Sequence, residues 1–202
     1  MITTYGSLHR LALLLVGLAA LLLYSLAGVA APSAVRADEL AVGETAPESV
    51  DAPASQAELA ASLGMSELEL QTLNLINLDR LSRGIQPLTW DPKLAEVARA
   101  HAAEMMATGK VTHEGVDGSM PYARIKAGAD RVNWAGENIW TYRGRLAHLG
   151  PDTMHAAMMA EPHEPNLWNH IWNVLYPGYH RVGIAIVVSP TGVQYLTEDF
   201  AD

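Results

Sequence analysis

Residues 87–115, PLTWDPKLAEVARAHAAEMMATGKVTHEG, contain the start, the full length and the end of one predicted helix. Asp91-Pro92 favours a helix start, because an Asp side chain accepts hydrogen bonds from the first backbone amides and proline fits the first helical position. A stripe with helical spacing follows, made of Leu94, Val97, Ala98, His101 and Met105. Gly109 is typical of a helix end, so His113 is expected in the loop just beyond it.

A second helix is predicted upstream of this stretch. Ser66-Glu67-Leu68-Glu69 forms a capping box, in which the Ser hydroxyl and the Glu carboxylate each accept a hydrogen bond from a backbone amide near the helix start. Apolar residues then recur at helical spacing until Gly84. Three polar residues of this helix, Asn74, Asn77 and Arg80, are expected to cap loops or the turn at Gly84.

Downstream, the chain changes from helical to strand patterns. Helices are expected within residues 117–128 and 152–161, and a short amphipathic segment at 170–175. The predicted strands are residues 132–140, 181–188 and 193–200. Ser189-Pro190-Thr191-Gly192 is a turn sequence that joins the last two strands into a hairpin. Helices followed by a terminal hairpin predict an α+β fold with helices packed on an antiparallel sheet.

The N-terminal region has the features of an export segment. His9-Arg10 precedes a Leu-rich uncharged block, and small residues follow, so residues 1–37 are interpreted as a signal peptide or an uncleaved signal-anchor. Residues 38–65 contain acidic, Ala, Pro and Ser residues without Lys or Arg, which is typical of a solvated linker. Residues 66–202 are left as the folded domain. We therefore expect a secreted or cell-surface protein that meets the membrane only through an uncleaved N-terminus.

Composition excludes several classes of function. The 202-residue chain has a net charge of −9, no basic block and no cysteine. The charge argues against nucleic acid as a partner, because phosphate binding depends on clustered Lys and Arg. The lack of cysteine excludes disulfides, a thiol nucleophile and a thiolate zinc site.

Four polar residues are candidates for a shared site. They are His113, Glu137 of the segment AGENIW (residues 135–140), Glu161 and His170. Two imidazoles and two carboxylates suit a zinc-type divalent metal or a general acid–base pair. Their spacing matches no metal motif, so structural roles are equally compatible with the local sequence: a loop histidine, a solvent-facing strand glutamate, a helix-end charge and a helix-start histidine.

The remaining histidines and the tryptophans favour structural roles. His101 lies on an apolar helix stripe and is expected to be a packed core histidine. The histidines without a recognisable constellation are His148, His155, His163 and His180. The tryptophans, interpreted as core or cleft-wall residues rather than a sugar platform, are Trp90, Trp134, Trp140, Trp168 and Trp172.

The order of these elements resembles the bacterial branch of the CAP superfamily of cysteine-rich secretory, antigen 5 and plant pathogenesis-related proteins, also called SCP-like domains. The similarity covers roughly residues 68–200 and rests on ordered motifs: PLTWDPKLAEVA, the histidine after that helix, GEN followed by a hydrophobic residue, HIWNVL, and the VGI and terminal strands. It implies a three-layer α-β-α sandwich with a central antiparallel sheet and a cleft.

The resemblance also implies roles for the four candidates. His113 and His170 match the two cleft histidines on which a divalent metal, usually zinc, is found in the family. Glu137 matches the Glu of the GEN motif, and Glu161 matches the remaining acid in a segment longer than usual. Leu167-Trp168-Asn169 replaces the residues commonly found before the second histidine, and a Trp pair there would narrow the cleft.

Three functions follow as alternatives from this resemblance. The first is a secreted binding module whose cleft takes up a metal and a small ligand or protein partner. The second is a hydrolase in which metal-bound or Glu137-activated water attacks a peptide or ester carbonyl, with Glu137 as the catalytic residue. The third is a lipid- or sterol-binding module with an apolar pocket. No GxSxG nucleophile motif is present, and the fold alone does not select among these.

Overall fold

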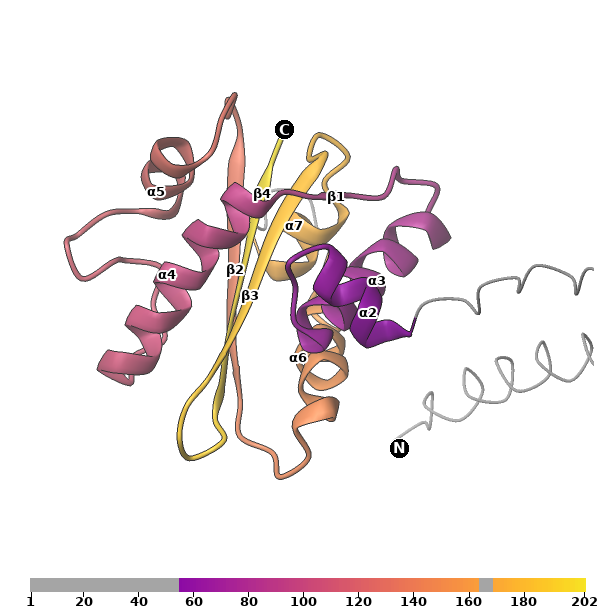
Figure 1. Cartoon of the computed structure of the whole chain (residues 1–202). Coiled ribbons are helices and arrows are strands. Elements are labelled where there is room, and N and C mark those ends of the chain that lie inside the picture. Colours follow the sequence, from indigo (N-terminus) through magenta and orange to yellow (C-terminus); the bar gives the residue numbers. More distant parts are fainter. Residues whose placement is uncertain (1–54, 164–168) are drawn as a thin grey trace, which may run out of the picture. The chain divides into compact units, whose positions relative to one another are not determined.

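The computed structural model describes residues 55–163 and 169–202, and Figure 1 shows their arrangement. The predicted signal segment, residues 38–54 of the predicted linker and the pair Leu167-Trp168 lie outside the described residues. The described elements are α2 (Gln56–Ser62), α3 (Glu67–Ser82), β1 (Thr89–Trp90), α4 (Pro92–Thr108), α5 (Pro121–Gly128), β2 (Ala135–Tyr142), the 3-10 helix η1 (Ala147–Leu149), α6 (Gly150–Met159), α7 (His170–Leu175), β3 (Arg181–Val188) and β4 (Gln194–Ala201).

The two helices with clear capping signals form where they were predicted. At α3 both bonds of the capping box are present, with Ser66 N–H donating to Glu69 Oε2 at 2.8 Å and Glu69 N–H to Ser66 Oγ at 3.3 Å. At α4, Asp91 Oδ1 accepts from the Lys93 amide at 2.9 Å, and Gly109 ends the helix with a φ of 68°. In the described part of the chain, none of the helices combines the length and apolarity needed to cross a bilayer.

The structure departs from the linker prediction at its C-terminal end. Gln56–Ser62 form α2, with a capping box of their own between Ser55 and Glu58. Ala60 of this helix is buried and belongs to the same apolar cluster as Met65. A capping box satisfies backbone amides locally, so even an Ala-rich polar segment folds when it can also bury one apolar contact.

The sheet has the order β1-β3-β4-β2 within the described residues. β3 pairs antiparallel with β4, as the hairpin prediction requires, and β4 also pairs antiparallel with β2. β1 pairs parallel to β3, so the sheet is mixed rather than wholly antiparallel. Strand β1 was missed because its two residues, Thr89–Trp90, are too few to show alternation.

Strand β2 is shifted by two to three residues relative to the prediction of 132–140. It begins at Ala135, because the carboxylate of Asp202 holds the backbone before it: Oδ1 accepts hydrogen bonds from the amides of Asn133 and Trp134 at 2.9 and 3.0 Å. A side-chain carboxylate that occupies these amides takes them out of strand pairing.

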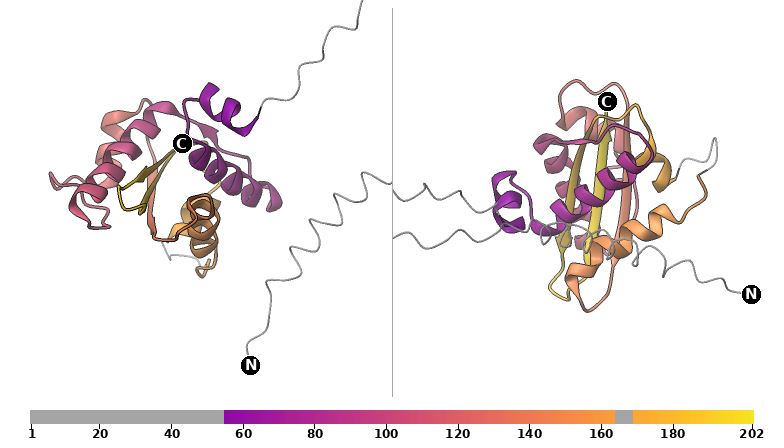
Figure 2. Two further views of the ribbon diagram at one scale, coloured as in Figure 1. Left: turned by 60° about the horizontal axis from the view of Figure 1, so that its bottom comes forward. Right: turned by 90° about the vertical axis from the view of Figure 1, so that its right-hand side faces the viewer.

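Helices cover both faces of the sheet and make the three layers that Figure 2 shows. Helices α4 and α5 contact one face, and α3, α6 and α7 lie on the other. The core on the second face includes Ile76, Met154 and Phe200, all fully buried. Burial of apolar side chains on both faces stabilises the α-β-α sandwich, which is the predicted fold.

Gly183 sets how closely α4 approaches the sheet. A Cβ built at this position of β3 would lie 2.1 Å from the backbone nitrogen of Ala95 and 2.1 Å from the carbonyl carbon of Leu94. Both are backbone atoms of α4, which cannot rotate away as a side chain can. Only glycine therefore permits this contact.

Arg80 and Asn77 hold the loop after α3, as predicted, whereas Asn74 is exposed and its side chain forms no hydrogen bond with the described residues. Asn77 donates to the Leu88 carbonyl at 3.0 Å and accepts from the Leu88 amide at 2.7 Å. Arg80 is fully buried and donates to four carbonyl oxygens at 2.8 to 3.0 Å, those of Gln86, Val174, Tyr176 and Tyr179. One guanidinium thus joins α3 to the loop after it, to the end of α7 and to the segment that follows α7.

Candidate functional site

Glu137 is buried in strand β2, with a side chain only 1% exposed. Its Oε1 lies 2.7 Å from His113 Nδ1, and its Oε2 accepts a 2.7 Å bond from Arg124 Nη2 of α5. Arg124 also donates to the carbonyl oxygen of His113 at 2.9 Å. A buried carboxylate is costly without partners; here the guanidinium supplies an opposite charge and the imidazole lies within hydrogen-bond distance.

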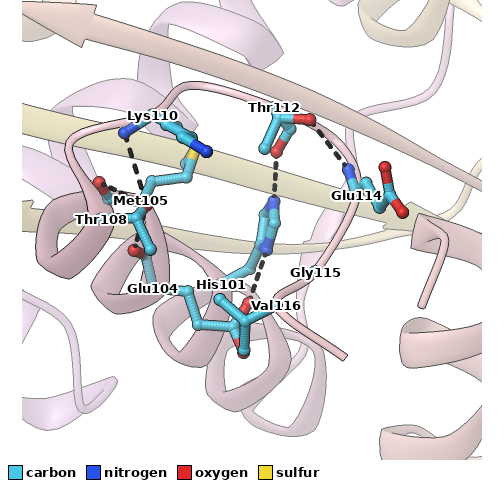
Figure 3. A pocket seen from close by; sticks show the side chains of 9 residues that line it. All are labelled: His101, Glu104, Met105, Thr108, Lys110, Thr112, Glu114, Gly115 and Val116. Atoms are coloured by element: carbon cyan, nitrogen blue, oxygen red, sulfur yellow. Dashed lines mark hydrogen bonds and ion pairs between the residues drawn. The ribbon is translucent and has the colours of Figure 1, made fainter. Parts of the chain in front are cut away.

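His101 of α4 supports the loop that carries His113. Figure 3 shows its imidazole between Thr112 and Glu104, with Nε2 2.8 Å from the Thr112 carbonyl oxygen and Nδ1 3.3 Å from Glu104 Oε2. His101 is 1% exposed, which confirms its prediction as a packed core histidine. Its Nε2 also lies 3.9 Å from Glu137 Oε1, so it borders the same carboxylate.

The second pair, His170 and Glu161, lies on the other side of β2. Its carboxylate contacts the start of α7 twice: Glu161 Oε1 is 2.6 Å from His170 Nδ1, and Oε2 accepts from the His170 amide at 3.0 Å. The ring of Trp140 packs edge-on against this imidazole, with centroids 5.1 Å apart. Asn138 donates to the His170 carbonyl at 3.2 Å and so ties α7 to β2.

Both histidines line one open groove, of about 770 Å³, along β2. In each imidazole Nδ1 is engaged by a carboxylate, while no described residue forms a hydrogen bond with Nε2. Glu137 and Glu161 lie behind the histidines and not on the groove wall. The remaining lining residues are Val111, Thr112, Glu114, Met120, Ile139, Trp140 and Thr141.

The four predicted residues therefore come together as two pairs on either side of an edge strand. Glu137 contacts His113 directly, and its link to α7 runs through Asn173, which donates to the Glu137 carbonyl at 3.2 Å and to Asn138 Oδ1 at 2.9 Å. Within residues 55–163 and 169–202, no three His, Asp or Glu side chains are close enough to hold one metal ion. A metal in the groove would depend on the two imidazoles and solvent.

The family model for the cysteine-rich secretory protein family, CAP, matches residues 73–200, which is more than half of the chain. The chain belongs to the CAP family. The uncharacterized protein YkwD of Bacillus subtilis is 26% identical over 125 residues, which are 62% of this chain and 44% of YkwD. The chain thus spans less than half the length of that relative.

Two solved structures share the CAP fold. An outer surface protein from Borrelia burgdorferi superposes with a TM-score of 0.58 at 16% identity, over 67% of this chain and 92% of that one. An extracellular protein containing a SCP domain from Bacillus anthracis gives a TM-score of 0.54 at 19% identity, over 75% and 45% of the two chains. At these identities the likeness establishes the fold alone.

Two buried acids underlie the groove of this CAP domain. Asp199 lies opposite Glu137 in the β2–β4 register, and burial, followed by the negative charge of Glu137, raises the pKa of Asp199 well above its usual range. Burial also raises the pKa of its neighbour Glu198 to about 7, although Asn138 donates to it. Neither oxygen of Asp199 has a hydrogen-bond partner among the described residues, which together with the raised pKa favours a neutral carboxyl.

Sequence reasoning missed Arg124, Asp199 and Glu198. Arg124 is an ordinary charge on a short helix, and no local pattern distinguishes it. The acids had a signal: the adjacent carboxyls of YLTEDF occupy successive positions of the terminal strand, where both faces of the sheet are covered by helices. Two acids in a strand buried on both faces must be neutralised or paired.

Trp140 has a role that was predicted for the tryptophans, and Trp134 does not. Trp140 lines the groove wall, as the cleft-wall interpretation requires. Trp134 is 67% exposed and is neither a core residue nor part of this groove. His155 is a packing residue, as expected, since it is buried and its Nε2 lies 2.8 Å from Asp79 Oδ2.

Proposed function

We propose that this CAP domain acts outside the cytoplasmic membrane, where its groove binds a divalent metal of zinc type through Nε2 of His113 and His170, together with a small ligand or protein partner. Two relatives with the same fold are described as an outer surface and an extracellular protein. The basic edge, apolar block and small residues of segment 1–37 support export.

The metal proposal rests on which ring nitrogen of each imidazole is engaged by another side chain. A carboxylate engages Nδ1 of each histidine, at 2.7 Å for His113 and 2.6 Å for His170. Carboxylates on the distal ring nitrogen orient metal-binding histidines and make the other nitrogen more basic. When bound, a zinc ion would supply Lewis acidity and a coordination position for a ligand.

The position of Glu137 favours binding over hydrolysis. A general base must reach a groove water, yet both oxygens of this buried carboxylate are held, one by His113 and one by Arg124. The lipid alternative is less favoured in this groove, because its apolar lining is interrupted by two threonines, two imidazoles and the carboxylate of Glu114.

Removal of both imidazoles tests the metal proposal. The purified protein is expected to take up about one zinc equivalent at about pH 7.5, measured by calorimetry and elemental analysis. His113→Ala combined with His170→Ala should abolish this uptake, while the circular dichroism spectrum stays unchanged. Affinity should also fall between about pH 7 and pH 5.5, because only neutral imidazole binds a metal.

The matched control replaces two exposed histidines outside the groove, His148 and His180, with alanine. That variant should keep its zinc equivalent. Uptake that survives the His113/His170 replacement, or that disappears equally in the control, would contradict the proposal. Affinity that stays flat over the same pH range would argue against histidine ligation.

A further inference from the structure

A second pocket, of about 680 Å³, opens near the start of β2. It differs from the His-lined groove because most of its wall is aromatic and it contains no imidazole or carboxylate. Tyr122 comes from α5, and Tyr176 and Tyr179 follow α7, so elements from both sides of β2 meet there. We call it the aromatic pocket, and its residues are Tyr122, Asn133, Trp134, Ala135, Tyr176 and Tyr179.

Trp134 presents an open aromatic face on a fixed backbone. Its side chain is 67% exposed, but its amide donates to Asp202 Oδ1 at 3.0 Å and its carbonyl accepts from the Asp202 amide at 3.3 Å. Asp202 also binds the side-chain amide of Asn133 at 3.0 Å, and Arg181 donates to its carbonyl. The backbone that carries the indole is therefore held before a ligand arrives, which reduces the entropy lost on binding.

Tyr179 lines the aromatic pocket, and its hydroxyl forms no hydrogen bond with the described residues. The residue is 3% exposed, and its ring stacks on Phe200 with centroids 5.7 Å apart. Burial raises the pKa of Tyr179 to about 12, so the group keeps its proton. A Cβ at Gly136 would lie 2.6 Å from this oxygen, so glycine there leaves it room.

We propose that the aromatic pocket binds a neutral sugar ring, a hexose or an N-acetylhexosamine. The C–H face of a pyranose packs on the electron-rich face of an indole, which Trp134 offers. The hydroxyl groups of the sugar can donate hydrogen bonds to Tyr179 and to the side-chain amide of Asn133, and can accept hydrogen bonds from them. Of the four aromatic rings only those of Trp134 and Tyr122 are exposed, because Tyr176 is half-buried and Tyr179 is buried. Two open rings suit a single flat ligand better than a proline-rich peptide, which docks along an extended groove of exposed aromatic side chains.

The test titrates the full domain with glucose, galactose and N-acetylglucosamine, using saturation-transfer NMR and tryptophan fluorescence. At least one sugar should bind with a dissociation constant on the order of 1 mM, as a small ligand in an open site does. Trp134→Ala should weaken this binding at least about tenfold. Tyr179→Phe keeps the ring on Phe200 and removes one hydrogen bond, so a loss of about threefold to tenfold is expected.

Matched controls separate this site from folding and from the metal proposal. Leu146→Ala removes another exposed apolar side chain, and Tyr195→Phe removes another hydroxyl from a buried tyrosine; neither should change sugar affinity. The His113/His170 double replacement should also bind the sugar normally, because neither histidine lines the aromatic pocket. Absence of saturable sugar binding, equal affinity in Trp134→Ala, or binding of a polyproline peptide alone would each overturn the inference.

Discussion

Replacing Arg80 with alanine is expected to lower the free energy of unfolding by at least about 4 kcal/mol. The fully buried guanidinium donates to four carbonyl oxygens, and those of Val174 and Tyr179, whose bonds are buried, would lose their donor without gaining access to water. An unsatisfied buried polar group costs about 1–3 kcal/mol. Arg80→Lys should recover only part of the loss, because an ammonium cannot reproduce the planar fork.

Urea unfolding, followed by tryptophan fluorescence, measures this change. Arg83→Ala is the matched control near the same helix end: its guanidinium is 43% exposed and pairs with Asp79 four residues earlier. Removing such an exposed pair should cost less than about 1 kcal/mol. A loss below about 1 kcal/mol for Arg80→Ala would show that the four carbonyls find other donors.

We expect the second large effect at Glu198, whose ionisation makes the free energy of unfolding depend on pH. Burial raises the pKa of this carboxyl from 4.5 to about 7 in the native state. Between these values the native protein holds a proton that the unfolded chain has released, so stability is fully present below pH 4.5 and falls as the pH rises toward 7. The expected loss is about 3 kcal/mol.

Glu198→Gln should remove most of this slope. The comparison is the change in unfolding free energy between about pH 4.5 and pH 8, which is insensitive to a constant packing cost of the substitution. Part of the fall should persist, because the raised pKa of Asp199 acts in the same direction. Glu96→Gln, at an exposed position of α4, is the control and should keep the full slope. An unchanged slope in Glu198→Gln would show that this carboxyl is ionised in the native state.

Local sequence signals predicted the two long helices and the terminal hairpin of the domain. The Ser66–Glu69 capping box, Asp91-Pro92 and Gly109 each satisfy or release backbone groups within a few residues, so their effect does not depend on the rest of the chain. The terminal hairpin follows from a turn and two apolar runs in the same way. The joint order of these elements was enough to indicate the CAP family.

The features that the sequence did not predict depend on contacts between residues that are far apart along the chain. Strand β1 exists because it lies beside β3, and the shift of β2 depends on the carboxylate of Asp202, 68 residues after Trp134. The charge that accompanies Glu137 comes from Arg124, which nothing in its own neighbourhood singles out. Sequence named the four candidate residues, but their grouping into two His–carboxylate pairs required the fold.

The contact at Gly183 limits where this domain can vary. Because α4 lies against strand backbone, a larger residue there cannot be accommodated by a change of rotamer, and the whole helix would have to lift. Lifting α4 would carry His101 away from the loop that it supports. Substitutions are therefore easier to accommodate in the loops that border the groove than in the layer beneath them, which must keep its shape.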